Sequence, residues 1–132
     1  MSEENVAIVL EGFERYEAGE SDVEGRWHED GVLTGPEGWP EKGPFEGRNA
    51  IRAQFDRLGS DYAETRFTDI QVIAQRGEWV VVRFTWRTRG QASDIQTAAD
   101  MVAAIRVQDG RVLEGHYRWH AADALEAAGL SE

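Results

Sequence analysis

The chain has 132 residues, of which 41% are hydrophobic and 30% are charged, a composition that is typical of one soluble globular domain and excludes full disorder. Its 14 basic and 25 acidic residues give a formal net charge of −11, so we expect no binding to nucleic acid or to an anionic membrane. The absence of cysteine excludes disulfides and thiolate chemistry and fits a reducing cytoplasm, where we expect the protein to act. We expect neither a membrane span nor a signal peptide, because no apolar run reaches roughly 18 residues and the start Met1–Glu4 is acidic.

The first half of the chain has the three- and four-residue periodicity of amphipathic helices. Apolar residues at this spacing predict helices over 2–18 and 48–58, and Gly19 is a natural stop for the first of them. A capping-box pattern at Ser21–Glu24 predicts a further short helix over about 22–28.

A brief predicted strand at Val32–Leu33 is followed by a long loop over 35–47. All three prolines of the chain lie in this loop, which excludes a helix interior and a central strand. Trp39 lies in the middle of the loop, and we expect so large an aromatic side chain to pack over another surface. We interpret it either as a lid over a pocket or as an anchor for a dimer contact.

From residue 62 the pattern changes to the two-residue alternation of strands. We predict four strands, over 62–75, 79–88, 95–107 and 111–120. The alternation of the first shifts phase near Phe67–Ile70, which predicts a bulge there. The pair Asp109-Gly110 predicts a tight hairpin turn in which both residues have a positive φ.

A last short helix is predicted over 122–128, with Asp123 as its N-cap and Gly129 behind it. Helices followed by antiparallel strands indicate an α+β fold, which we assign to a single domain over 1–132. Because an apolar sheet face must be covered, we expect the N-terminal helices to be its only cover. A curved sheet around these helices is a cone, and an incompletely filled cone holds a pocket.

The alternation divides the strands into an apolar phase, which we expect to face the pocket, and an outer phase. The residues expected to line the pocket are Phe13, Tyr16, Trp27, Trp39, Phe55, Val82, Phe84, Trp86, Met101, Ala103, Tyr117 and Trp119. Leu113 is assigned to the same inward phase, while Asp100 and Glu114 fall in the outer one. The aromatic side chains suit a small, flat, hydrophobic ligand, although ordinary core packing explains each of them singly just as well.

Several short motifs, in this order along the chain, resemble a known family. They are Ser2–Val6, Phe13–Gly19, Phe45–Arg52, Val80–Arg83, Gln108–Val112 and Ala124–Leu130. Together they resemble the SnoaL-like branch of the nuclear-transport-factor-2-like (NTF2-like) superfamily over nearly the whole chain. The resemblance implies a conical α+β barrel, a deep apolar pocket and a homodimer formed through the sheet. It does not select a reaction, since relatives include isomerases, cyclases, epoxide hydrolases, dehydratases and binding domains.

The chain departs from many of these relatives at two places. Tyr117–His120 stands where many relatives end the last strand with an acidic residue, and Ala103 stands where many carry a histidine. His116 and His120 are roughly 13 Å apart along an extended strand, so they cannot share one metal ion, and we expect no metal site.

Three residues remain for acid/base chemistry. The resemblance makes Asp30 a candidate base, since relatives often place an aspartate near the pocket rim; the alternative is that Asp30 caps a turn. His120, at the end of a strand, is a second candidate base if it reaches the cavity mouth, and otherwise belongs to an outer-face cluster with His116 and Arg118. The Tyr16 hydroxyl is a candidate oxyanion donor, with simple packing as the alternative.

We therefore expect a protein that holds a small hydrophobic molecule of polyketide-, steroid- or terpenoid-like character and needs no metal or organic cofactor. As an enzyme, it would be an isomerase, cyclase or dehydratase. The alternatives are a non-catalytic ligand-binding protein and a dimeric association domain whose interior is filled by its own side chains.

Overall fold

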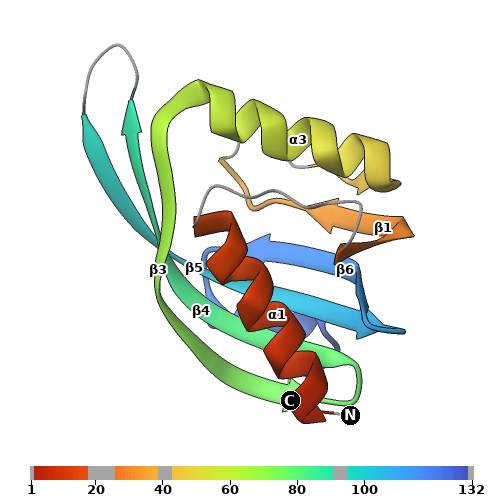
Figure 1. The fold of residues 1–132 in the computed structure, drawn as a ribbon. Helices are drawn as coiled ribbons and strands as arrows, with labels where there is room; N and C mark the ends of the chain where they lie inside the picture. The colour runs from red at the N-terminus through yellow and green to blue at the C-terminus, as the bar shows by residue number, and fades with distance from the viewer. Residues whose placement is uncertain (1, 18–25, 39–42, 91–94, 131–132) are drawn as a thin grey trace.

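The computed structural model describes residues 2–17, 26–38, 43–90 and 95–130, with the backbone alone for 2, 16–17 and 58–64. These residues form three helices and one six-stranded sheet (Figure 1). The helices are α1 (Ser2–Glu17), α3 (Arg48–Asp61) and α4 (Ala121–Ala127). The strands are β1 (Trp27–Thr34), β2 (Phe45–Glu46), β3 (Tyr62–Arg76), β4 (Trp79–Gly90), β5 (Gln96–Gln108) and β6 (Arg111–Arg118). In the part of the chain described, every helix is too short or too polar to span a bilayer.

The sheet has the strand order β2-β1-β6-β5-β4-β3. Its pairs are antiparallel except for β1 and β6, which run parallel, so the sheet is mixed. It curves around α1 and α3, as Figure 1 shows. The predicted α+β fold, with a curved sheet that wraps around N-terminal helices, is confirmed.

The concave face of the sheet, called here the inner face, carries the main hydrophobic core. Val82, Ala103 and Tyr117 lie side by side across β4, β5 and β6 and are all buried in it. The α1 residue Phe13 packs against the same cluster, its ring 5.1 Å from that of Phe84. The predicted phase of β4 is therefore confirmed, because its even-numbered residues face the helices.

The convex face of the sheet, called here the outer face, is covered in part by α4. Val81, Val102 and Ala104 form a second buried cluster there with Ala124 and Ala128. The expected cover of the inner face by the N-terminal helices is confirmed for the described residues, but a second apolar patch on the outer face was not expected. The sequence feature that indicates burial of the outer face is the unbroken apolar run in each of β4 and β5. In strands that are buried on both faces, apolar and polar residues do not alternate.

Two predicted backbone features are confirmed. The β3–β4 register shifts between Thr68 and Gln71, and Asp69 within this bulge has φ 57°. In the β5–β6 turn, Asp109 has φ 55° and Gly110 has φ 78°. Both devices strengthen the twist that bends the sheet into a cone.

Another register shift corrects the predicted phase of β6. A bulge between Arg106 and Val107 puts Val107 opposite Val112. Val112 therefore packs against the inner core in place of Leu113, which was expected there. Periodicity along one strand cannot reveal this shift, because the extra residue is defined only by its pairing with the neighbouring strand.

Two element boundaries also differ from the prediction. The short helix expected over 22–28 falls largely outside the described residues, but its last part was wrong, because Trp27 and His28 open strand β1. At α4, His120 is the N-cap residue and Asp123 lies in the first turn. An acidic side chain there stabilises the positive end of the helix dipole without capping it.

Trp27 joins three elements at the base of the cone. Its carbonyl oxygen accepts hydrogen bonds from Nε and Nη2 of Arg48 at 3.2 and 3.0 Å, which fixes the start of α3 on β1. Its indole is 7% exposed and lies against two glycines. A Cβ atom would be 2.8 Å from the indole if placed on Gly31 and 3.0 Å from it if placed on Gly115. The two glycines therefore make room for the indole.

This close contact predicts opposite effects for two glycine substitutions. Gly31→Ala should lower the free energy of unfolding by roughly 1–3 kcal/mol, because the new methyl group overlaps the indole and the His28 carbonyl oxygen. Gly12→Ala is the control: a Cβ on Gly12 in α1 meets no atom within 4 Å, so this change should stabilise by about 0.5–1 kcal/mol. Urea unfolding of both variants measures the difference. Equal stability of Gly31→Ala and the wild type would contradict the packing described here.

Candidate functional site

The inner face combines a closed aromatic core with partly exposed aromatic side chains. Phe13, Phe67 and Phe84 are buried and pack in tilted and edge-to-face contacts, with ring centroids 5.0–5.5 Å apart. Trp86 and Trp119 pack against this core but are only half-buried. Part of the aromatic surface of the cone therefore remains open to contact from a further molecule.

The described inward-facing positions of β4, β5 and β6 carry no acidic, basic or histidine side chain. Asp100 and Glu114 lie on the outer face, as predicted. Asp100 is exposed and accepts a hydrogen bond from Thr85 Oγ1 at 3.1 Å, and Glu114 pairs with Arg106. The polar groups that the inner face does offer are neutral hydroxyls, such as that of the buried Thr88.

The residues predicted to line the pocket lie mostly on the inner face. Seven are in the buried cluster: Phe13, Trp27, Val82, Phe84, Met101, Ala103 and Tyr117. Phe55, Trp86 and Trp119 pack against that cluster from partly buried positions. Trp39 and the side chain of Tyr16 lie outside the described part of the chain.

The candidate acid/base residues are not brought together on the inner face. The Asp30 side chain is 82% exposed, and its backbone N–H donates to His28 Nδ1 at 3.1 Å. His120 is exposed at the start of α4. Either residue would have to act at the rim of the cone.

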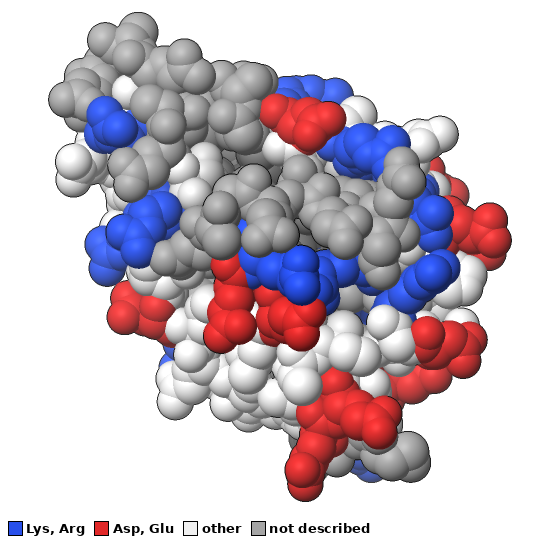
Figure 2. All heavy atoms as spheres, viewed as in Figure 1, with Lys and Arg blue, Asp and Glu red and all other residues white. Residues whose placement is uncertain are grey.

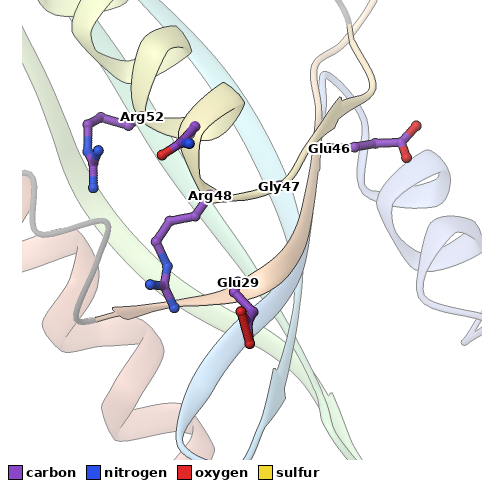
Figure 3. Close-up of a pocket in the computed structure, with 6 residues that line it drawn as sticks. Glu29, Glu46, Gly47, Arg48 and Arg52 are labelled. Carbon is purple, nitrogen blue, oxygen red and sulfur yellow. The ribbon is translucent and has the colours of Figure 1, made fainter.

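A groove of about 490 Å³ lies at the start of α3, and the sequence analysis missed it. Its lining consists of Glu29, Glu46, Gly47, Arg48, Asn49 and Arg52. In Figure 3, Arg48 and Arg52 extend from α3 to the same side, whereas Glu46 points away from them. The sequence feature that could have indicated this groove is the spacing of Arg48 and Arg52. They are four residues apart in a helix that begins after Gly47, so they share one helix face.

Side chains of both charge signs lie on the face of the molecule that carries α1 and α3, where Figure 2 shows them intermixed. Across the described residues, no three histidine or carboxylate side chains are close enough to hold a metal ion.

The outer face carries an ionic cluster centred on Glu114. Its carboxylate accepts hydrogen bonds from Arg106 Nη1 at 2.8 Å and from His116 Nε2 at 2.9 Å. Arg106 also donates to Glu78, and the His116 ring stacks on Trp79 with centroids 6.1 Å apart. The interpretation of His116 as part of an outer-face cluster is confirmed. Burial raises the pKa of Glu114, but the bonds from His116 and Arg106 outweigh it and hold the pKa below its usual value.

A curved mixed sheet around two helices, with an apolar inner face, defines an α+β cone of the NTF2-like class. The chain belongs to the SnoaL-like domain family, whose model matches residues 9–115. No curated protein sequence matches the chain significantly.

Solved structures agree with this assignment. An NTF2-like protein from Burkholderia xenovorans is 26% identical, with 97% of each chain covered and a TM-score of 0.74. A proposed polyketide cyclase from Xanthomonas campestris is 18% identical, with 92% of this chain and 94% of that chain covered and a TM-score of 0.76. TerC, co-crystallised with polyporic acid, is 18% identical over 96% of this chain and 98% of its own, with a TM-score of 0.74.

The ionic cluster of the outer face predicts a pH-dependent effect of Glu114→Gln. Because the folded chain lowers the pKa of Glu114, this carboxylate stabilises the fold above its unfolded pKa of about 4.3, and the contribution is lost as the pH falls through the lower folded value. Thermal unfolding should show a lower Tm for the variant near pH 7 and a smaller difference at about pH 3. The exposed Glu29, changed to Gln, is the control. A Glu114→Gln effect of equal size at both pH values would exclude this cause.

Proposed function

We propose that the chain binds a small, flat, hydrophobic molecule of polyketide-, steroid- or terpenoid-like character against the inner face of the cone. The observation that carries the proposal is the partial exposure of Trp86 and Trp119, which pack against the inner core and are only half-buried. Burying aromatic surface of this kind against a ligand is favourable by about 25 cal/mol per Å². Concave, mostly apolar sites with a few neutral polar groups are typical of small-molecule binding.

The comparisons support a ligand of this class. TerC has the same fold and was crystallised with polyporic acid. The inner core of the present chain contains aromatic side chains from α1, α3 and five strands, and aromatic surface of this kind suits a ring-shaped ligand.

The second candidate function is catalysis without a cofactor, as an isomerase, cyclase or dehydratase. The observation that favours it is the similarity to a proposed polyketide cyclase. In this proposal Tyr16 is the oxyanion donor and Asp30 or His120 is the base. Ligand binding ranks first because Asp30 and His120 are exposed and the described inner face of β4–β6 has no acidic, basic or histidine side chain.

A pair of tryptophans on one strand tests the binding proposal. Trp86 faces the inner core, whereas Trp79 lies on the outer face against His116. With the tricyclic compounds fluorene and fluorenone as probes, Trp86→Leu should weaken binding roughly tenfold, because an aromatic contact surface is lost. Trp79→Leu should leave the affinity unchanged. Ligand-observed NMR titrations measure both dissociation constants.

The proposal would be overturned if the wild-type protein bound neither probe and no compound of a wider polycyclic and terpenoid panel. An equal loss of affinity in the two variants would place the ligand elsewhere.

We further propose a cytoplasmic homodimer that forms through the outer face. A pure association domain would bind no probe and would dissociate on Arg83→Glu, since Arg83 is exposed there, as sedimentation velocity would show.

Catalysis has a separate test. For any probe that the protein converts, Asp30→Asn should lower kcat by roughly 10²–10⁴, since this is the usual contribution of a general base. His120→Gln and Tyr16→Phe identify the other two roles in the same assay. A kcat that all three variants leave unchanged would remove these residues from the proposed mechanism, while unchanged ligand binding by Asp30→Asn agrees with the binding function.

A further inference from the structure

A row of three threonines crosses the inner face. Thr65 pairs with Thr88 across β3 and β4, and Thr88 pairs with Thr97 across β4 and β5. Thr88 is two residues beyond the inward-facing Trp86 on β4, so all three side chains share the face of the core. Thr88 is buried and Thr97 is exposed, so the row leads from solvent toward the interior.

The hydroxyls of this row have unused hydrogen-bonding capacity. Thr88 Oγ1 and Thr97 Oγ1 bond to each other, which uses one of their two hydrogens. In the described part of the chain, Thr65 Oγ1 is one of two buried side-chain polar atoms without a hydrogen-bond partner. Leaving such a group unpaired is costly, so native structures keep few of them.

Trp86 lies next to the unpaired hydroxyl. It pairs with Phe67 on β3, which makes it the diagonal neighbour of Thr65, a separation that an aromatic side chain can bridge. Opposite Trp86 on β5 is Ala99, a residue with a small side chain. Because Thr65 Oγ1 is buried in the free chain, a ligand can reach it only when the atoms that cover it move aside.

We propose that Thr65 is a specificity-determining residue, whose hydroxyl donates a hydrogen bond to a carbonyl or other neutral acceptor of a ligand that lies on Trp86. The inference rests on the proposed binding function and adds the chemistry of the ligand to it. A neutral acceptor is required because the described inward positions of β4–β6 carry no basic side chain to compensate a carboxylate, and the chain has a net charge of −11.

The test compares two probes that differ only in a carbonyl group, fluorenone and fluorene, on the full chain and two variants. The wild type should bind fluorenone roughly threefold to tenfold more tightly than fluorene, which corresponds to one net hydrogen bond. Thr65→Val should abolish this preference and leave the affinity for fluorene unchanged. Thr85→Val is the matched control, because Thr85 lies on the outer face with Asp100, and it should keep the preference.

Thermal unfolding without any probe gives a second readout. Replacing an unpaired buried hydroxyl with the methyl group of valine should raise the Tm of Thr65→Val, by roughly 1–4 °C, whereas Thr85→Val should not gain stability. A lower Tm for Thr65→Val would show that the hydroxyl has a structural partner and would overturn the inference.

The binding outcomes separate the two proposals. Equal affinities of the wild type for the two probes, or a preference that survives in Thr65→Val, would overturn the role of Thr65 and leave the binding function intact. Failure of both probes to bind would overturn the binding function and the role of Thr65 with it.

Discussion

The contact of Phe13 with Phe67 and Phe84 decides which side of the sheet becomes the interior. These rings hold α1 against β3 and β4 at centroid distances of 5.5 and 5.1 Å. Because side chains alternate along a strand, fixing Phe84 inward also fixes Trp86 inward and Arg83 outward. The chemistry of both faces depends on that choice, since a slip of one residue would exchange the two faces.

The two faces of the same strands consequently have different chemistry. The outer face carries the apolar patch beneath α4 and the ionic cluster around Glu114, which pairs with Arg106 and His116. The described inner positions of β4–β6 carry aromatic, aliphatic and hydroxyl groups. Within the described parts of β4–β6 the charged side chains thus lie on the outer face, where they avoid the cost of burial in the apolar core.

Membership of the SnoaL-like family explains the cone but not a reaction, because one fold supports many activities. The two places where the sequence departs from many relatives include inner-face positions. Ala103 is fully buried at the centre of the core, and Tyr117 lies beside it with its ring 6.0 Å from Phe84. At these two inner-face positions the side chains serve packing in the core.

The sequence by itself determined the α+β class, the inward phase of β4, the bulge near Asp69 and the turn at Asp109-Gly110, because each of these follows from periodicity or local backbone preference. Only the tertiary structure decided that Val112 replaces Leu113 on the inner face, that α4 covers the outer face and that Arg48 and Arg52 line a groove. It also showed that Thr65 Oγ1 has no partner. These features depend on which strands and helices meet, and residues that are far apart in the chain meet only when the sheet closes.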